Sequence, residues 1–235
     1  MAVDYFSDTF LDTLGEWQRG WKENQALRED IAKKLELQAI KLPQKYRIVS
    51  APCYRKRYLL PSDINPLFMD SEISDGATSW TLDKKYAEFF KGFWRDDAVT
   101  AVIFKHTPNP SEVILNIASL YESTNFMNAV NAYIQKSGKE AATFIKIGAQ
   151  QKEVILNTNL RVDEIIAFTG KSSPFDELCI AAGVNQYDQD SVWKFFVEIG
   201  MQPEVPRYVE KDGVKRILAK VLAKANELKK SKKQP

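Results

Sequence analysis

The chain has 235 residues, of which 44% are hydrophobic and 27% are charged, and its formal net charge is +2. This length and composition suit a globular protein with a buried core. No run reaches the roughly 18 consecutive apolar residues that a membrane span needs, and acids stand where a secretory signal carries basic residues, so we expect neither membrane insertion nor export.

Scarce residue types limit the chemistry that the chain can perform. Cys53 and Cys179 are far apart and form no CxxC pair, which argues against a disulfide framework or a zinc knuckle. The single histidine, His106, excludes multi-histidine metal sites, and the glycines form neither GxGxxG nor GxxxxGK[ST]. We therefore expect no metal, and catalysis by carboxylates, arginine, hydroxyls and amides.

Residues 1–42 are predicted to be helical. Apolar residues recur there at three- and four-residue spacing in two stripes, the first of which contains Trp17 and Trp21. Pro43 ends this helical pattern.

Short apolar runs rich in Val, Ile and Phe follow, and such runs predict strands. The predicted strands span residues 46–50, 98–106, 112–117, 143–147, 153–157 and 164–169, and helical patterns at 83–93 and 123–136 interrupt them. Strands with helices inserted between them indicate an α+β fold.

The sequence after Gly170 is helical again, and its last helix is basic. Residues 211–235 carry a local net charge of +7, which leaves −5 on the rest of the chain. The apolar face of 214–228 predicts a helix docked on the core with its lysines outward, and the alternative is an electrostatic footprint for RNA, DNA or an acidic partner. We divide the chain into N-terminal helices (1–42), a core (43–170) and a helical C-terminal extension (171–235).

Three segments carry the candidate catalytic and binding residues. They are LPQKYRIVS (42–50), ATSWTLDKKYAEFF (77–90) and QQKEVILNTNLRV (150–162). Each also has an ordinary structural interpretation. Arg47 can be a strand-edge cation, and Ser79 and Thr81 can be capping hydroxyls before a helix. Gln151 and Glu153 share one face if both lie on a strand, and that face can simply be solvated.

The order and spacing of these segments resemble the mono-ADP-ribosyltransferase superfamily. An Arg on a first strand is followed by Ser-x-Thr with LDxxxAxxF behind it, and later by Gln-x-Glu-Val-Ile-Leu. More narrowly, the pattern resembles the Arg–Ser–Glu branch, which includes clostridial exoenzyme toxins and bacteriophage-encoded transferases. The resemblance covers roughly residues 43–170. A branch with His on the first strand does not fit, because the only histidine is His106, which we interpret as structural.

The resemblance implies a mixed β core of the ADP-ribosyltransferase type, NAD as co-substrate and a set of residue roles. Glu153 is implied to be catalytic, Gln151 to face the acceptor, and Ser79 to orient Glu153. Arg47 is our first choice for holding NAD, because YRIVS (46–50) has the cleaner strand pattern. Arg55 is the alternative, ranked second because Pro52 interrupts the approach to it.

Two positions of the branch's Ser-Thr-Ser differ here. Trp80 and Thr81 stand at the second and third positions, and Ile48 replaces the Gly that often follows the first-strand Arg. Thr81 keeps a hydroxyl at the NAD side of the motif. Trp80 is expected either to pack on the nicotinamide or to fill the core.

The resemblance also bears on the acceptor. Gln at position 151 disfavours arginine, so we expect a nucleobase in RNA or DNA or a protein Asn or Gln side chain. The expected context is a toxin or phage effector in the cytoplasm of the producing or infected cell, with an antitoxin or inhibitor protein as a candidate partner. The alternatives are an NAD glycohydrolase and a catalytically inactive module that binds nucleic acid or protein.

Overall fold

A computed structural model of the chain describes residues 5–20, 24–90, 95, 97–137, 151–169, 179, 182–199 and 208–231. The chain divides into two compact units that are interleaved along the sequence. The first unit comprises Met1–Arg55, Glu72–Phe90 and Phe104–Glu164, and the second comprises Lys56–Ser71, Lys91–Ile103 and Ile165–Pro235. Both units contain strands and helices, so the α+β class predicted from the sequence is confirmed.

Strands of the first unit pair in the order β4 (Val113–Asn116), β5 (Glu153–Arg161), β2 (Glu72–Thr81) and β1 (Cys53–Leu59). These pairings are all antiparallel. The β2–β5 pair places Thr81 opposite Glu153 and Ser79 opposite Ile155. Side chains alternate between the two faces of a sheet, so Ser79 and Glu153 share one face and Trp80 lies on the other.

A bulge interrupts the β2–β5 pair between Ser74 and Ala77. Gly76 lies inside the bulge with a φ of 62°, a conformation that costs glycine little because it has no Cβ. The side chain of Asp75 is buried at the same point. The bulge therefore places a buried carboxylate within β2, the same strand that carries Ser79.

Helices α1 (Asp8–Arg19) and α2 (Gln25–Ala39) form where the N-terminal helical pattern predicts them. The Ser7 hydroxyl accepts from the backbone N–H of Phe10, and this cap satisfies one donor in the first turn of α1. Trp21 lies outside the described residues.

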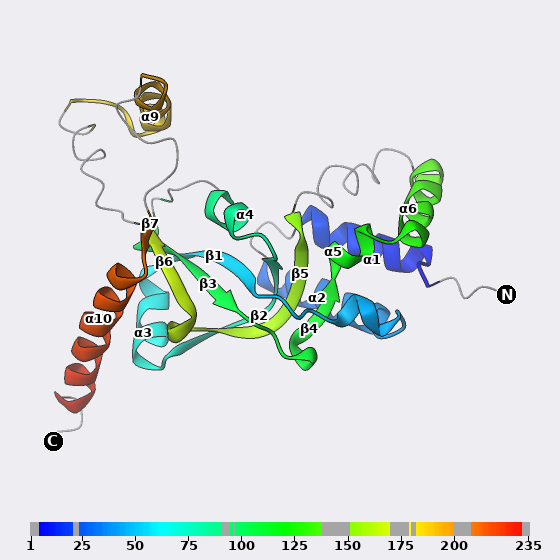
Figure 1. Cartoon of the computed structure of the whole chain (residues 1–235), viewed down its shortest axis with the longest axis horizontal. Coiled ribbons are helices and arrows are strands. Elements are labelled where there is room, and N and C mark those ends of the chain that lie inside the picture. Colours follow the sequence, from blue (N-terminus) through cyan, green and yellow to red (C-terminus); the bar gives the residue numbers. More distant parts are fainter. Residues whose placement is uncertain are drawn as a thin grey trace. The chain divides into compact units, whose positions relative to one another are not determined.

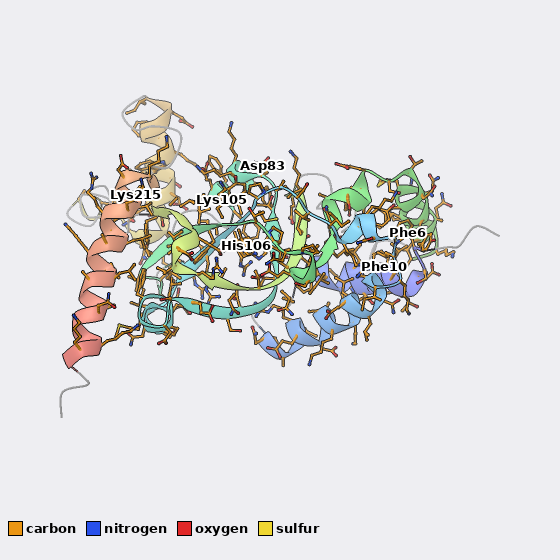
Figure 2. All side chains as sticks on the ribbon, turned by 60° about the horizontal axis from the view of Figure 1, so that its bottom comes forward. Phe6, Phe10, Asp83, Lys105, His106 and Lys215 are labelled. Carbon is orange, nitrogen blue, oxygen red and sulfur yellow. The ribbon has the colours of Figure 1, made fainter. Side chains whose placement is uncertain are left out.

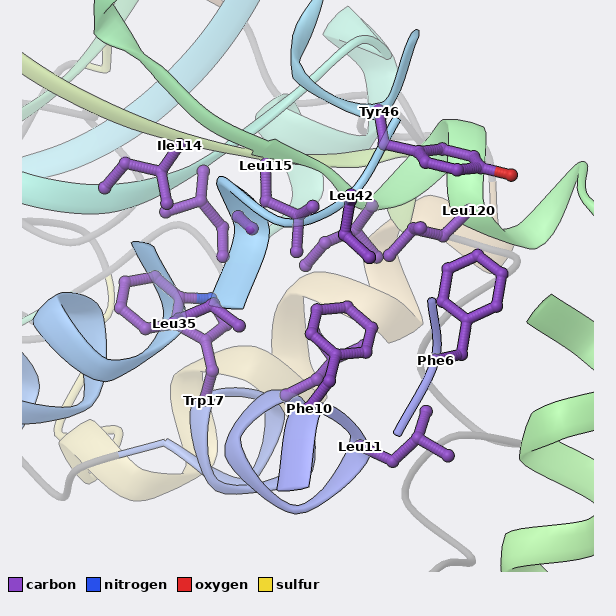
Figure 3. Packing of buried hydrophobic residues seen from close by; sticks show 14 of the residues in the cluster. Phe6, Phe10, Leu11, Trp17, Leu35, Leu42, Tyr46, Ile114, Leu115 and Leu120 are labelled. Atoms are coloured by element: carbon purple, nitrogen blue, oxygen red, sulfur yellow. The ribbon is translucent and has the colours of Figure 1, made fainter. Parts of the chain in front are cut away.

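A single hydrophobic cluster joins these helices to the sheet. Its buried members are Phe6, Phe10, Leu11, Leu14, Trp17, Ile31, Ala32, Leu35, Ala39, Leu42, Tyr46, Ile114, Leu115, Ile117, Leu120, Phe126, Val130 and Ile155. Figure 3 shows Trp17 and Phe10 on α1 with Ile114 and Leu115 on β4 above them. Burial of a large aliphatic or aromatic side chain contributes about 1.5–3 kcal/mol, so this cluster holds α1 firmly against the first unit's sheet.

Three further helices of the first unit lie within the described residues. They are α4 (Lys84–Phe89), α5 (Ile117–Tyr121) and α6 (Thr124–Ser137). The carboxylate of Asp83 accepts from the backbone N–H groups of Lys85 and Tyr86, so it caps the start of α4. The predicted helix at 83–93 is therefore confirmed as far as Phe89, and residues 91–93 lie outside the described part.

In the second unit, β6 (Ile165–Thr169) pairs antiparallel with β7 (Tyr208–Glu210). On its other side β6 neighbours β3 (Thr100–His106), whose residues up to Ile103 belong to this unit. Its helices among the described residues are α3 (Pro61–Met69), α9 (Gln189–Glu198) and α10 (Asp212–Ser231). Helix α10 lies beside α3 (Figure 1). Val214 and Ala225 of α10 are buried while Lys215 is exposed (Figure 2), which confirms the predicted amphipathic docking of the basic helix.

The strand predicted at 46–50 is wrong. Residues Gln44–Arg47 form a 3-10 helix, η1, and residues 48–50 have no regular structure. The strand β1 begins instead at Cys53, directly after Pro52. A proline immediately before a strand leaves every ladder N–H of that strand intact, so Pro52 marks the start of β1 rather than interrupting it. The strand predicted at 143–147 lies outside the described residues.

Candidate active site

The centre of the candidate site is a hydrogen bond between neighbouring strands. Ser79 Oγ on β2 donates to Glu153 Oε1 on β5 at 2.5 Å. The antiparallel register brings these side chains to one face at the start of β5, close to where β2 ends. Glu153 is only 5% exposed, so the structure brings together two of the residues predicted from the sequence and buries the carboxylate.

A second donor to Glu153 comes from the N-terminal helix and was missed in the sequence. The indole Nε1 of Trp17 donates to Glu153 Oε1 at 2.9 Å, across 136 positions of the chain. Both donors therefore bind the same carboxylate oxygen. Within the described ranges, no group donates a hydrogen bond to the other oxygen, Oε2.

Burial sets the protonation behaviour of Glu153. It raises the pKa of the carboxyl because the ionised form loses its hydration. The hydrogen bonds from Ser79 and Trp17 stabilise the ionised form and offset part of this rise. Carboxyl groups with such environments are typical of functional sites, although ion-pair networks also produce them.

Two tyrosines lie near this carboxylate and were also missed. Burial raises the pKa of the Tyr86 and Tyr121 phenols, and the negative charge of Glu153 raises both further. Tyr86 comes from α4 and Tyr121 from α5. Tyr86 lies within the segment 77–90 that carries the family resemblance, so the sequence could have indicated that it lies near the site. No sequence pattern indicated this for Tyr121.

Arg55, the second-ranked arginine, contacts the strand that carries Ser79. Its Nη1 donates to the backbone carbonyl of Ser79 at 2.8 Å, and its Nε and Nη2 contact Asp75 Oδ2 at 3.0 and 2.9 Å. Arg28 of α2 donates to the Asp75 backbone carbonyl at 2.8 Å, with its Nη1 3.9 Å from Asp75 Oδ1. Asp75 thus binds two arginines, and neither Asp75 nor Arg28 was predicted as part of the site.

Arg47, the first-ranked arginine, lies in η1 and not on a strand. Its Nε is buried without a hydrogen-bond partner among the described residues. The reason for preferring Arg47, a cleaner strand pattern, therefore fails, because the strand in this part of the chain is β1 and carries Arg55.

The hydroxyl of Thr81 connects the two motif segments. Thr81 Oγ1 donates to the backbone carbonyl of Gln151 at 2.6 Å and accepts from the backbone N–H of Asp83 at 3.0 Å. Gln151 precedes β5, and Lys152 between them has a φ of 42°. The expectation that Gln151 and Glu153 share one strand face by alternation is thus wrong, because the chain turns at Lys152.

Trp80 lies on the opposite face of β2 from Glu153. Its indole is buried, donates to Thr78 Oγ1 at 3.2 Å and has its ring centroid 5.7 Å from that of His106. Of the two expectations for Trp80, the structure therefore places it in the core and not beside the carboxylate.

His106 belongs to a buried network on that opposite face. Its Nδ1 lies 2.7 Å from Glu164 Oε1 and its Nε2 lies 3.0 Å from Glu112 Oε2. The hydrogen bond with Glu164 raises the pKa of His106, burial opposes this, and Glu112 adds to the rise. Figure 2 shows His106 beside its exposed neighbour Lys105 on β3. This agrees with the structural interpretation of the single histidine.

Neither cysteine takes part in a disulfide: Cys53 and Cys179 are both free and buried. Burial raises the pKa of the Cys53 thiol to about 12. Across the described ranges, no group of three or more His, Cys, Asp or Glu side chains can hold a metal ion. Within the same ranges, no helix is both long and apolar enough to span a bilayer.

Comparisons of the chain with protein-family models, with curated proteins and with solved structures found no match. The resemblance to mono-ADP-ribosyltransferases therefore remains a prediction from the motif residues of the sequence.

Proposed function

We propose that the chain is an NAD-dependent mono-ADP-ribosyltransferase and that Glu153 is its catalytic carboxylate. The observation that supports this most directly is the hydrogen bond of 2.5 Å from Ser79 Oγ to Glu153 Oε1. The segments 77–90 and 150–162 carry the family resemblance in sequence, and they contain the strand ends that form this contact. A hydroxyl that orients a buried glutamate is the arrangement that the resemblance implies.

The proposed reaction breaks the bond between C1′ of the NAD ribose and the nicotinamide nitrogen. The bonding electron pair leaves with neutral nicotinamide, and the ribose acquires oxocarbenium character, as in glycoside hydrolysis. Glu153 accepts a hydrogen bond from a ribose hydroxyl and stabilises the developing positive charge. A nitrogen of the acceptor then bonds to C1′ and releases its proton to solvent, so that ADP-ribose is transferred intact.

Arg55 is the arginine that we assign to NAD in place of Arg47. A guanidinium is planar, permanently charged and suited to bidentate contact with a pyrophosphate. Support comes from the position of Arg55 on β1, where it contacts the Ser79 carbonyl and Asp75. Arg47 lies in η1, and no contact with the Ser79–Glu153 pair among the described residues supports its assignment.

The proposed acceptor is a nucleobase in RNA or DNA, or a protein Asn or Gln side chain, because the resemblance implies such an acceptor where Gln stands at position 151. The exposed lysines of α10, such as Lys215 and Lys220, favour a negatively charged partner. The proposed context is a toxin or phage effector that acts in the cytoplasm, where an antitoxin or inhibitor protein would restrain it.

Labelled NAD incubated with the purified chain and a cell lysate tests this proposal. Wild type is expected to transfer the label to a macromolecule, and Glu153→Gln is expected to lose transfer while it stays folded. Glu122→Gln, which changes an exposed glutamate, is the matched control and is expected to behave as wild type. Unchanged transfer by Glu153→Gln would refute the assignment of the carboxylate.

Treatment of the labelled lysate with nuclease or with protease then identifies the acceptor class. Loss of the labelled macromolecule after nuclease alone indicates a nucleobase, and loss after protease alone indicates a protein side chain. Release of nicotinamide without labelled macromolecule would replace the proposal with an NAD glycohydrolase. No turnover of NAD would replace it with an inactive binding module.

A further inference from the structure

The carboxylate of Glu153 is held from two directions by residues that lie far apart in the chain. Ser79 Oγ approaches from the neighbouring strand at 2.5 Å, and Trp17 Nε1 approaches from α1 at 2.9 Å. The sequence motifs contain the serine but not the tryptophan. The contact with Trp17 therefore adds to the site an element that the family resemblance does not name.

Trp17 has little freedom to move. Its side chain is 2% exposed, and it packs in the cluster that includes Leu14 and Leu35 of the N-terminal helices and Ile155 of β5. Figure 3 shows the indole rising from α1 into this cluster, with its nitrogen at the edge of the ring system. A donor fixed by packing keeps its direction without further loss of side-chain entropy when a ligand binds.

The two donors leave the carboxylate with a defined orientation. Both bind Oε1, and no described group donates to Oε2. An oxygen that already accepts two hydrogen bonds anchors the group, whereas the second oxygen keeps its capacity to accept. Oε2 is therefore the carboxylate oxygen left to accept a hydrogen bond from a ligand.

We propose that Trp17 is a positioning residue of the active site, whose indole N–H fixes the Glu153 carboxylate together with Ser79 so that Oε2 meets the ribose of NAD. This role rests on the proposed transferase function. The titratable groups that face Glu153 from the other packed elements are Tyr86 on α4 and Tyr121 on α5. These phenols are the same in wild type and in the variants below, so a difference between variants reports on the indole.

Replacement of the indole by a ring without the N–H tests the proposal. Trp17→Phe is expected to lower kcat by about 10- to 100-fold, the range for a lost hydrogen bond to a charged group, with KM for NAD within about twofold. The acidic limb of the pH profile is expected to move to higher pH, because the ionised form of Glu153 loses a donor. Trp193→Phe in α9 is the matched control and is expected to leave kcat and the pH profile unchanged.

Benzothienylalanine introduced at position 17 separates positioning from packing. This amino acid has the shape of tryptophan with sulfur in place of the N–H, so it keeps the packing if phenylalanine does not. The same fall in kcat and the same shift of the acidic limb are expected. Unchanged kinetics in both variants would overturn the proposal. Faster turnover or a lower KM would also overturn it, because the indole would then occupy space that the substrate needs.

An NMR measurement tests the contact without NAD. In protein labelled with ¹⁵N at its five tryptophans, the Trp17 indole signal is assigned by its loss in Trp17→Phe. This signal is expected to move as Glu153 titrates, and the movement is expected to vanish in Glu153→Gln. A Trp17 signal that does not move as Glu153 titrates would contradict the hydrogen bond between the two residues. If wild type turns over no NAD while the signal follows Glu153, the proposed function fails and the positioning role fails with it.

Discussion

Arg55 donates an N–H to the backbone carbonyl of Ser79 at 2.8 Å, and the hydroxyl of the same serine donates to Glu153 at 2.5 Å. One residue of β2 thus connects an arginine on β1 with a glutamate on β5. The strands β1, β2 and β5 are neighbours in the sheet of the first unit. Arg55 thus contacts the main chain of the serine whose hydroxyl contacts Glu153.

We expect Arg55→Lys to reduce ADP-ribose transfer by about tenfold or more. Lysine keeps the positive charge but lacks the planar guanidinium group, which can donate several hydrogen bonds at once. Arg55 uses this group for both the Ser79 carbonyl and Asp75. Arg47→Lys is the matched substitution and is expected to retain wild-type transfer. Steady-state kinetics with labelled NAD compares the two. A larger loss in Arg47→Lys would restore the original ranking of the two arginines.

Ser79→Ala is expected to lower kcat by about 10- to 100-fold, since it removes one hydrogen bond to a charged group. The acidic limb of the pH–rate profile is expected to shift to higher pH, because the bond from Ser79 lowers the pKa of Glu153. Ser74→Ala changes an exposed serine on the same strand and serves as the control. An unshifted limb in Ser79→Ala would show that the hydroxyl does not act on the carboxylate.

Glu153 is expected to reduce stability at neutral pH. Its pKa is raised in the folded chain, so the stability associated with its protonated form is fully present below the ordinary glutamate pKa of about 4.3 and is lost as the pH rises through the folded value. Urea unfolding of wild type and Glu153→Gln at pH 5 and pH 8 measures this. Because other carboxyl groups are common to both proteins, the advantage of Glu153→Gln is expected to be larger at pH 8. An equal difference at both values would contradict the raised pKa.

The contribution of His106 to stability is also expected to fall as the pH rises, but for a different reason. Glu164 and Glu112 raise the pKa of the imidazole in the folded chain. Its contribution to the free energy of unfolding is therefore fully present below the ordinary histidine pKa of about 6.5. That contribution is lost as the pH rises through the pKa of His106 in the folded chain.

The corresponding variant is His106→Gln. It is expected to cost about 1–3 kcal/mol of unfolding free energy at pH 6, the range for hydrogen bonds with charged groups, and less at pH 9. Urea unfolding at both pH values measures the difference, with transfer activity as a second readout. A cost that grows with pH would show that the imidazole is neutral in the fold.

Local patterns predicted the half of the site that lies on the β2–β5 pair. Ser79 was expected to orient Glu153 because the family resemblance implies it, and the structure places the two side chains in contact. Composition predicted the strand that carries Glu153, whereas the strand that carries Ser79 was not among the strands predicted from apolar runs. The start of β1, the strand that carries Arg55, was missed for a local reason as well. Pro52 was interpreted as an interruption of the strand. A proline just before a strand, however, removes none of the backbone hydrogen bonds that the strand makes with its neighbours.

The other contacts could not be predicted from local patterns. Trp17 is part of an amphipathic stripe, and such a stripe shows that a face is buried without showing which strand it covers. The ion pairs of Asp75 depend on a bulge, which re-aims one side chain within an otherwise regular strand. The turn at Lys152 places Gln151 outside β5, and a positive φ at a lysine has no signal in the sequence.

The interleaving of the two units has a consequence for dissecting the protein. The chain leaves the first unit after Arg55, returns at Glu72, leaves again after Phe90 and returns at Phe104. A truncated chain that ends at Glu164 would still carry two segments of the second unit, deprived of β6, β7 and α10 that complete it. Single-residue substitutions are therefore better suited than truncations to locating the functional residues of this protein.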